Sequence, residues 1–263
     1  MIPFYFGSGE RRLFGVFRPA ERKRSPRRAI VLCHPWGQEY LRAHRSVCLL
    51  GSMLSAAGFD VLRFDYFGTG DAAGELSDAT LSGWETDIEA AIEEIRDTTG
   101  ATRVALAGVR LGATLAATVA VRRRDVVKEL VLWDPVVIGE EYLADLQGPL
   151  PHASLIDGPP AMGAANGGGG LEVKGFLLTE TMEQDLRSLD LPALVPALPD
   201  RTLFITSEVL ASHADLNTAL NCRADGTCVL EYIESGPAWL ECENYGVGVV
   251  PVKIFKRIAE WLG

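Results

Sequence analysis

The chain has 263 residues, 48% of them hydrophobic and 23% charged, a composition that excludes a disordered chain, a fibrous repeat and a coiled coil. Lys and Arg number 25 against 35 Asp and Glu, and the formal net charge of −10 would repel nucleic acid on average. The longest near-unbroken apolar stretch, residues 111–121, is too short to span a membrane, and the first residues lack the pattern of a secretory signal. We therefore expect a cytoplasmic protein with no membrane span and no nucleic acid partner.

Short apolar runs alternate with longer amphipathic runs along the chain. Strands are predicted at residues 13–18, 29–33, 61–64, 104–107, 130–133, 203–206 and 229–233. Helices are predicted at residues 46–57, 81–98, 111–121 and 250–262. This alternation is typical of parallel βαβ units, and the almost wholly apolar strands indicate a sheet that helices cover on both faces.

Residues 139–200 interrupt this alternation. Two short helices are predicted there, at 140–146 and 180–189, and between them lies a turn-rich stretch that ends in four consecutive glycines at 167–170. Such a run holds no single conformation without outside support. We interpret 139–200 as a cap with a mobile loop, inserted into a core formed by residues 1–138 and 201–263. Insertions at the strand ends of an α/β sheet usually cover a ligand crevice.

A strand, a sharp turn and a helix are predicted in succession in VALAGVRLGATLAA, residues 104–117. This stretch resembles the nucleophile elbow of the α/β-hydrolase superfamily. Three other stretches match the superfamily in order: His34–Gly37 resembles the oxyanion-hole loop, residues 64–71 resemble the glycine-rich loop after the next strand, and Trp84–Asp87 resembles a helix of serine-aminopeptidase-like members. The resemblance implies an α/β-hydrolase fold, with a mostly parallel eight-stranded sheet, helices on both faces and a small cap.

Two further stretches, Trp133–Val137 and Gly236-Pro237-x-Trp239, are similar to segments of one subgroup. This subgroup comprises the bacterial hydrolase-like proteins associated with exosortase and exopolysaccharide loci. The similarity predicts the same association for this chain.

The sequence departs from the superfamily at the residues that carry its chemistry. The superfamily's elbow is G-x-S-x-G, and its turn presents a serine oxygen to the base and the oxyanion hole. Here the middle position is Arg110, which has no nucleophilic atom at neutral pH, and no G-x-S-x-G occurs elsewhere. The superfamily's histidine follows the last strand, but residues 233–242 contain none. The loss of both groups predicts that serine-triad hydrolysis is absent.

The four histidines of the chain are His34 in the oxyanion-type loop, His44 near the first helix start, His152 in the cap and His213. His213 follows the strand after which the family places its acid, so a triad rearranged around it would still lack a nucleophile. The five cysteines form no CxxC pair, which excludes the usual zinc and redox motifs. Cys33 and Cys242 are alternative nucleophiles, but a cysteine in an apolar strand, such as Cys33, is more often a core residue.

Two interpretations of Arg110 are open. In the first, its guanidinium, the N–H of Leu111 and a loop amide near Trp36 together hold the anionic part of a ligand. In the second, Arg110 pairs with an acid at a neighbouring strand end, such as Asp134 or Glu208, and fills a dead pocket.

Aromatic side chains are predicted to gather at the strand ends: Trp36, Tyr66, Phe67, Trp133 and Trp239. Core packing accounts for Trp133. Trp36, with the adjoining Gly37, and Tyr66 and Trp239 are predicted to line an apolar ligand crevice. The carboxylates Asp65, Asp71, Asp87 and Asp134 are dispersed, so they are interpreted as solvated or capping groups. No metal and no cofactor are predicted.

The predicted function is that of a pseudo-hydrolase, which binds a small anionic or acyl-bearing ligand at the former active site. A protein partner is a further prediction. One alternative is a non-serine enzyme of the lyase, decarboxylase or acyl-transfer type. It would use Arg110 and the oxyanion loop, with Asp65, His34 or His213 as acid or base. Another alternative is hydrolysis of an ester, thioester or amide by an unrecognised nucleophile.

Overall fold

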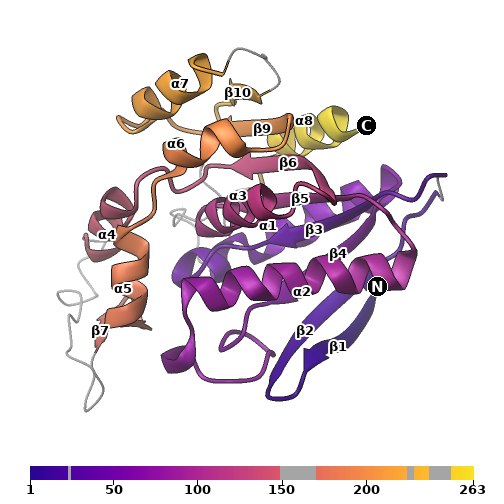
Figure 1. Ribbon diagram of the computed structural model, residues 1–263, viewed down its shortest axis with the longest axis horizontal. Coiled ribbons are helices and arrows are strands. Elements are labelled where there is room, and N and C mark those ends of the chain that lie inside the picture. The colour runs from indigo at the N-terminus through magenta and orange to yellow at the C-terminus, as the bar shows by residue number, and fades with distance from the viewer. Residues whose placement is uncertain (23–24, 149–169, 224–227, 237–249) are drawn as a thin grey trace.

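The computed structural model describes residues 1–22, 25–148, 170–223, 228–236 and 250–263 (Figure 1). An eight-stranded sheet has the order β1-β2-β4-β3-β5-β6-β9-β10. Its strands are β1 Ile2–Ser8, β2 Arg11–Arg18, β3 Ala29–Cys33, β4 Asp60–Asp65, β5 Val104–Val109, β6 Val127–Trp133, β9 Arg201–Thr206 and β10 Cys228–Tyr232. The pairs β1–β2 and β2–β4 are antiparallel, and the other pairs are parallel. The predicted fold class is confirmed.

Helices cover both faces of the sheet. They include α1 Gly37–Ala56, α2 Leu81–Thr99, α3 Leu111–Arg122 and α8 Val252–Leu262. Side chains of a strand point alternately to its two faces, so β3 contributes to both layers. Ile30 and Leu32 pack in the core with α1 and α8, whereas Val31 and Cys33 pack in the core with α2 and α3.

Strand β1 and the start of helix α1 differ from the sequence prediction, and β7 Gly170–Val173, β8 Phe176–Thr179, α6 Leu191–Leu194 and α7 His213–Asn221 were not predicted either. Strand β1 was not predicted, because as an edge strand it exposes apolar side chains such as Ile2 and Tyr5 and shows no clear buried face. Helix α1 begins at Gly37 instead of Ser46. The added turns carry polar side chains, among them Glu39, that lie at the cavity described below rather than in the core. The hydrophobicity pattern of the sequence therefore did not predict these turns as helix.

The segment between β6 and β9 forms its own small structure. It contains α4 Gly139–Gln147, the antiparallel pair β7 Gly170–Val173 and β8 Phe176–Thr179, α5 Glu180–Arg187 and α6 Leu191–Leu194. Elements α4, α5 and β7 lie together at the left of Figure 1. The glycine run at 167–170, predicted to be mobile, lies outside the described residues except for its last position. His152, which the sequence analysis assigned to the cap, also lies outside the described residues.

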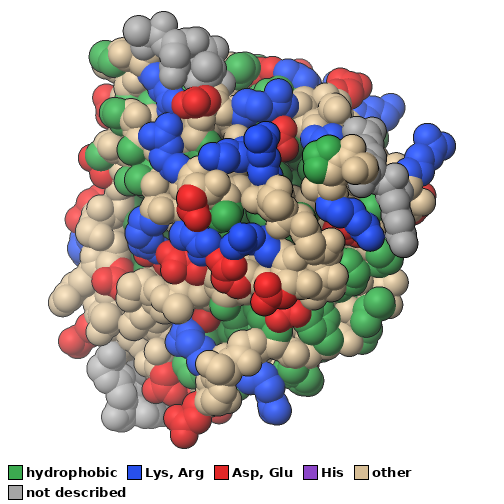
Figure 2. Space-filling model, turned by 45° about the vertical axis from the view of Figure 1, so that its right-hand side comes forward, with side chains coloured by type: hydrophobic (Ala, Val, Ile, Leu, Met, Phe, Trp, Pro, Cys, Tyr) green, Lys and Arg blue, Asp and Glu red, His purple; other side chains and the backbone are tan. Residues whose placement is uncertain are grey.

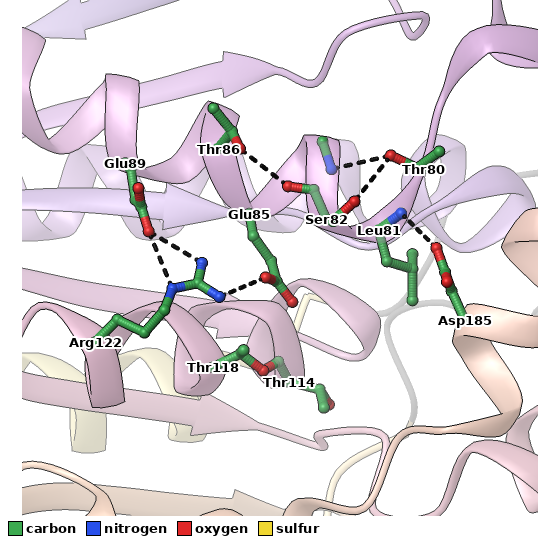
Figure 3. Close-up of polar contacts among 11 residues, drawn as sticks. Thr80, Leu81, Ser82, Glu85, Thr86, Glu89, Thr114, Thr118, Arg122 and Asp185 are labelled. Carbon is green, nitrogen blue, oxygen red and sulfur yellow. Dashed lines mark hydrogen bonds and ion pairs between the residues drawn. The ribbon is translucent and has the colours of Figure 1, made fainter.

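Polar contacts join this segment to the core, and α2 to α3. The carboxylate of Asp185 in α5 accepts a hydrogen bond from the N–H of Leu81, at the start of α2, over 3.4 Å (Figure 3). In the same region Arg122 of α3 pairs with Glu85 and Glu89 of α2 at 2.7 and 3.0 Å.

No described helix combines the length and the hydrophobicity needed to cross a membrane.

Candidate functional site

Arg110 occupies a strained turn between β5 and α3, with φ 52° and ψ −126°. Positive φ is unfavourable for a side chain with a Cβ and costs about 1–3 kcal/mol. Two glycines make the turn possible: a Cβ at Gly108 would overlap the backbone of Ala113, and a Cβ at Gly112 would overlap the carbonyl groups of Cys33 and His34. The glycine spacing read in the sequence therefore brings α3 into close contact with β3 and β5.

The Arg110 side chain is held by a carboxylate from another element. Its Nε donates to Oε1 of Glu39 in α1 at 2.9 Å, and its Nη1 lies 3.4 Å from the backbone oxygen of Asp134. Tyr142 of α4 donates its hydroxyl to Oε2 of Glu39 at 2.9 Å, and the guanidinium lies 5.5 Å from the Tyr142 ring centroid. Arg110 is 9% exposed. The carboxylate that pairs with it is Glu39, because helix α1 begins early enough to bring this residue to the turn. Asp134 and Glu208, the acids named from the sequence, line the same cavity, and Asp134 meets Arg110 through its backbone oxygen.

The ion pair governs the ionisation of this group. Burial alone lowers the pKa of Arg110, but the nearby Glu39 carboxylate more than offsets this and the pKa stays above its usual value. Burial and the same carboxylate raise the pKa of the Tyr142 hydroxyl. Arg110 is therefore a permanent cation and Tyr142 a neutral hydrogen-bond donor. Neither group can act as a base.

A cavity of about 450 Å³ lies over this ion pair. Its apolar lining includes Trp36, Tyr142, Leu146, Val173 and Leu210, and its charged lining includes Glu39, Arg42, Arg110, Asp134, Asp145, Lys174 and Glu208. The cavity is of the size of a small-molecule site and combines apolar walls with a few polar groups. Trp36 and Gly37, predicted to lie at a ligand crevice, line it.

Asp134 is a buried titratable group in the lining of this cavity. It is 6% exposed and has φ 43°. Its Oδ1 accepts a hydrogen bond from the N–H of Ser207 at 2.6 Å, and its buried Oδ2 has no hydrogen-bond partner among the described residues. Burial raises the pKa of Asp134 to about 6, against the lowering effect of Ser207 and Arg110. A carboxyl with this pKa exchanges its proton near neutral pH.

His34 and Asp65 lie together, but apart from Arg110. The Nε2 of His34 is 3.8 Å from Oδ1 of Asp65, and Tyr40 donates its hydroxyl to the same oxygen at 2.9 Å. Both line a separate hollow of about 240 Å³, to which Arg110 does not contribute. The Nδ1 of His34 is 2.9 Å from the carbonyl of Pro35, and burial lowers the pKa of His34. His34 is therefore neutral at pH 7.

His213 begins helix α7 His213–Asn221, after β9. Its Nδ1 accepts a hydrogen bond from the N–H of Leu210 at 3.2 Å, so its proton is on Nε2. Burial lowers the pKa of His213; the Glu141 charge opposes this, and the Arg110 charge adds to it. The charge of Arg110 thus reaches His213, although His213 does not line the cavity.

The other predicted site residues occupy different environments. Leu111 is buried at the start of α3. Tyr66 is buried and stacks on Trp84, with ring centroids 5.2 Å apart. Trp239 lies outside the described residues. Cys33 is buried, and burial raises the pKa of its thiol to about 12, so it carries no thiolate at neutral pH.

Two of the carboxylates interpreted as solvated or capping are buried. Asp87 is 1% exposed. Its carboxylate pairs with Arg11 of β2 at 2.7 Å and accepts a hydrogen bond from the N–H of Phe67 at 2.9 Å, and these contacts compensate for its burial. The second buried carboxylate is Asp134. Asp65 accepts hydrogen bonds from Tyr40 and from the N–H of Asp71. Within the described ranges, no three His, Cys, Asp or Glu side chains are grouped closely enough to hold a metal ion.

Four of the residues at the site that the argument uses were missed from the sequence: Glu39, Arg42, Tyr142 and Lys174. They lie in three separate segments, and none belongs to a motif. The start of α1 gives no sequence signal, because Trp36 stands at the N-cap position, where Ser, Thr, Asp or Asn would mark a helix start.

The sheet order, the strained turn between β5 and α3 and the helices on both faces define an α/β-hydrolase-fold protein. Residues 24–156, about half of the chain, match the family model for serine aminopeptidase, S33, and the chain belongs to this family.

Solved structures share the fold at low sequence identity. Est1E from Butyrivibrio proteoclasticus, solved with ferulic acid, has a TM-score of 0.70 at 16% identity, over 98% of this chain and 97% of that chain. Proline iminopeptidase from Mycobacterium smegmatis has a TM-score of 0.64 at 15% identity, over 99% and 97%. An alpha-beta serine hydrolase homologue from Coxiella burnetii has 0.62 at 13%, over 100% and 97%. A search of curated proteins found no match to this sequence.

Proposed function

We propose that this protein is a pseudo-hydrolase, which binds a small anionic or acyl-bearing ligand in the 450 Å³ cavity and has no serine-hydrolase turnover. The observation that carries the proposal is Arg110 in the turn between β5 and α3, where the superfamily pattern has its serine. The sequence after His213 contains no histidine, so the base expected after the last strand is missing as well. The nucleophile and the base of the triad are therefore both missing.

The ligand's anionic group binds to Arg42 and Lys174 rather than to Arg110. Arg110 is buried and its Nε lies 2.9 Å from Oε1 of Glu39, and Arg42 and Lys174 are further cations that line the same cavity. Trp36, Val173 and other apolar side chains of the lining receive the acyl part. Arg110 and Glu39 then form the floor of the site and fix its shape.

The test of lost turnover is labelling with a fluorophosphonate probe, together with nitrophenyl-ester hydrolysis. We expect wild type neither to be labelled nor to hydrolyse esters faster than Arg110→Ala. Labelling of a single residue in wild type, or ester hydrolysis that Arg110→Ala abolishes, would contradict the proposal. Thermal melts of both proteins establish that each is folded under the assay conditions.

The test of ligand binding is calorimetric titration with octanoate and with octanol. Octanoate is expected to bind more tightly than octanol, and Lys174→Gln is expected to reduce that difference. Lys256→Gln removes the same charge from an exposed site on α8 and serves as the control. Equal affinity for the acid and the alcohol would show that no cation recognises the ligand.

A second candidate function is a non-serine enzyme, and the observation that favours it is Asp134. Its pKa of about 6 and its buried Oδ2, which has no hydrogen-bond partner in the described part of the chain, suit a general acid or base at the cavity. In this function Asp134 moves the proton and the permanent Arg110 cation stabilises a developing negative charge through the field of the cavity. Turnover of a substrate that Asp134→Asn abolishes, with binding retained, would support it. The association with exosortase or exopolysaccharide loci and a protein partner remain predictions.

A further inference from the structure

A second cavity lies at the opposite end of the strands from the candidate site. Its volume is about 380 Å³, and it is lined by residues at the amino ends of β3, β5, β6 and β9. Five cations and one carboxylate are among its lining residues: Arg27, Arg28, Arg103, Lys128, Arg201 and Glu129. We call these six residues the basic basin. Figure 2, which brings the right-hand side of Figure 1 forward, shows Lys and Arg side chains gathered on the face that comes into view.

Three arginines of the basic basin, Arg27, Arg28 and Arg201, are held by contacts within the protein. The Nε of Arg201 is 3.1 Å from Oε1 of Glu129, and Nη2 of Arg28 is 3.7 Å from Oε2 of the same carboxylate. The guanidinium of Arg28 also lies 4.1 Å from the ring centroid of Phe59. Arg27 pairs with Asp60 at 2.9 Å. Because these contacts order the side chains before any ligand arrives, binding loses less conformational entropy.

The remaining two cations have no carboxylate partner among the described residues. Lys128 donates its ammonium to the backbone oxygen of Arg124 at 2.7 Å, and no ion pair of Arg103 occurs within the described ranges. Both side chains are exposed. The positive charge of the basic basin therefore exceeds what Glu129 and Asp60 can neutralise, on a chain whose formal net charge is −10.

We propose that the basic basin binds a small polyanion, a molecule that carries two or more phosphate groups. Each phosphate presents several oxygens to guanidinium forks and to an ammonium group at once. A concave site of this volume is in the range of small-ligand pockets. The net charge of −10 opposes the approach of an extended polymer or membrane surface of the same sign, but it acts less on a small ion that enters a locally positive hollow. The site is independent of the Arg110 cavity.

The experiment is calorimetric titration of the full chain with inorganic tripolyphosphate at low ionic strength, with citrate and anionic vesicles as parallel probes. We expect saturable one-to-one binding of tripolyphosphate, weakening as salt is added. The variant pair Arg103→Gln and Lys128→Gln, made together, is expected to weaken binding roughly tenfold. Both residues are exposed, so the fold is retained, and thermal melts verify this.

The matched control is Arg45→Gln with Lys253→Gln, which removes two exposed positive charges outside the basic basin. It is expected to leave tripolyphosphate affinity unchanged. The proposal is overturned if tripolyphosphate does not saturate, or if both double variants weaken binding equally. Citrate binding as tight as that of tripolyphosphate would overturn the phosphate assignment, and binding to vesicles alone would overturn the small ligand.

Discussion

Arg110 and Glu39 form a buried ion pair across the turn that positions the nucleophile in hydrolases of this fold, with 2.9 Å between Nε and Oε1. The two residues are 71 positions apart in the chain. The Glu39 carboxylate thereby satisfies a cation that the strained turn directs toward the cavity, and Tyr142 satisfies its second oxygen. An arginine at this turn is tolerated because α1 and α4 supply its partners.

Loss of Arg110 alone should be strongly destabilising. Arg110→Ala leaves the Glu39 carboxylate buried with one hydrogen-bond donor, and the expected loss in unfolding free energy is about 3–5 kcal/mol. Adding Glu39→Gln removes the uncompensated charge, so the double variant should be more stable than Arg110→Ala. Urea unfolding of wild type, both single variants and the double variant measures the coupling. Additive losses would mean that the pair does not interact energetically.

Asp134 should make the free energy of unfolding decrease as pH rises toward neutrality, opposite to the effect of a carboxylate whose pKa is lowered by folding. Its pKa is raised by burial to about 6 in the folded protein from an ordinary 3.8, so the folded state holds the proton more tightly than the unfolded state. The stabilising contribution is complete below the unfolded value and is lost as pH rises through about 6. Asp134→Asn mimics the protonated group at every pH. Its advantage over wild type should grow to about 2–3 kcal/mol between about pH 4 and pH 7, as denaturant titrations at several pH values can measure. A constant difference would contradict this.

The glycine that follows the turn should be intolerant of a methyl group. Gly112→Ala places a Cβ against the carbonyl groups of Cys33 and His34, and backbone atoms cannot move aside. We expect a loss of about 3 kcal/mol or more in unfolding free energy. Gly100→Ala is the comparison: Gly100 has φ +73° but open space around it, so strain of about 1–2 kcal/mol is the whole cost. Similar losses at the two positions would refute the packing argument.

The Cys33 thiol should not react with alkylating reagents in the folded protein. Its thiol is buried and has a pKa raised to about 12, whereas Cys222 is exposed. Iodoacetamide at mildly alkaline pH should therefore modify Cys222 within minutes and leave Cys33 unmodified until denaturant is added. Peptide mapping by mass spectrometry distinguishes the two. Rapid native modification of Cys33 would revive it as a nucleophile.

Hydrophobic periodicity in the sequence determined most of the scaffold, because each strand and helix carries its own buried face. Residues 81–98 predicted α2 almost to the residue, and the apolar run at 104–107 predicted the core of β5. The stretch around Gly108, Arg110 and Gly112 identified the turn through its resemblance to the hydrolase elbow. The two glycines are needed there because a Cβ would overlap neighbouring backbone atoms. Local patterns failed at β1 and at the first turns of α1, where polar or exposed side chains hide the period.

The partners of Arg110 were decided by the tertiary structure alone. Glu39, Arg110 and Tyr142 come from three elements, and no local pattern encodes which carboxylate meets which cation. Asp134 and Asp87 looked like surface carboxylates in the sequence, yet folding buried both. Ionisation depends on desolvation and on neighbouring charges, which exist only after the chain is packed. The sequence therefore determined that an arginine stands at the turn between β5 and α3, and the fold decided which groups surround it.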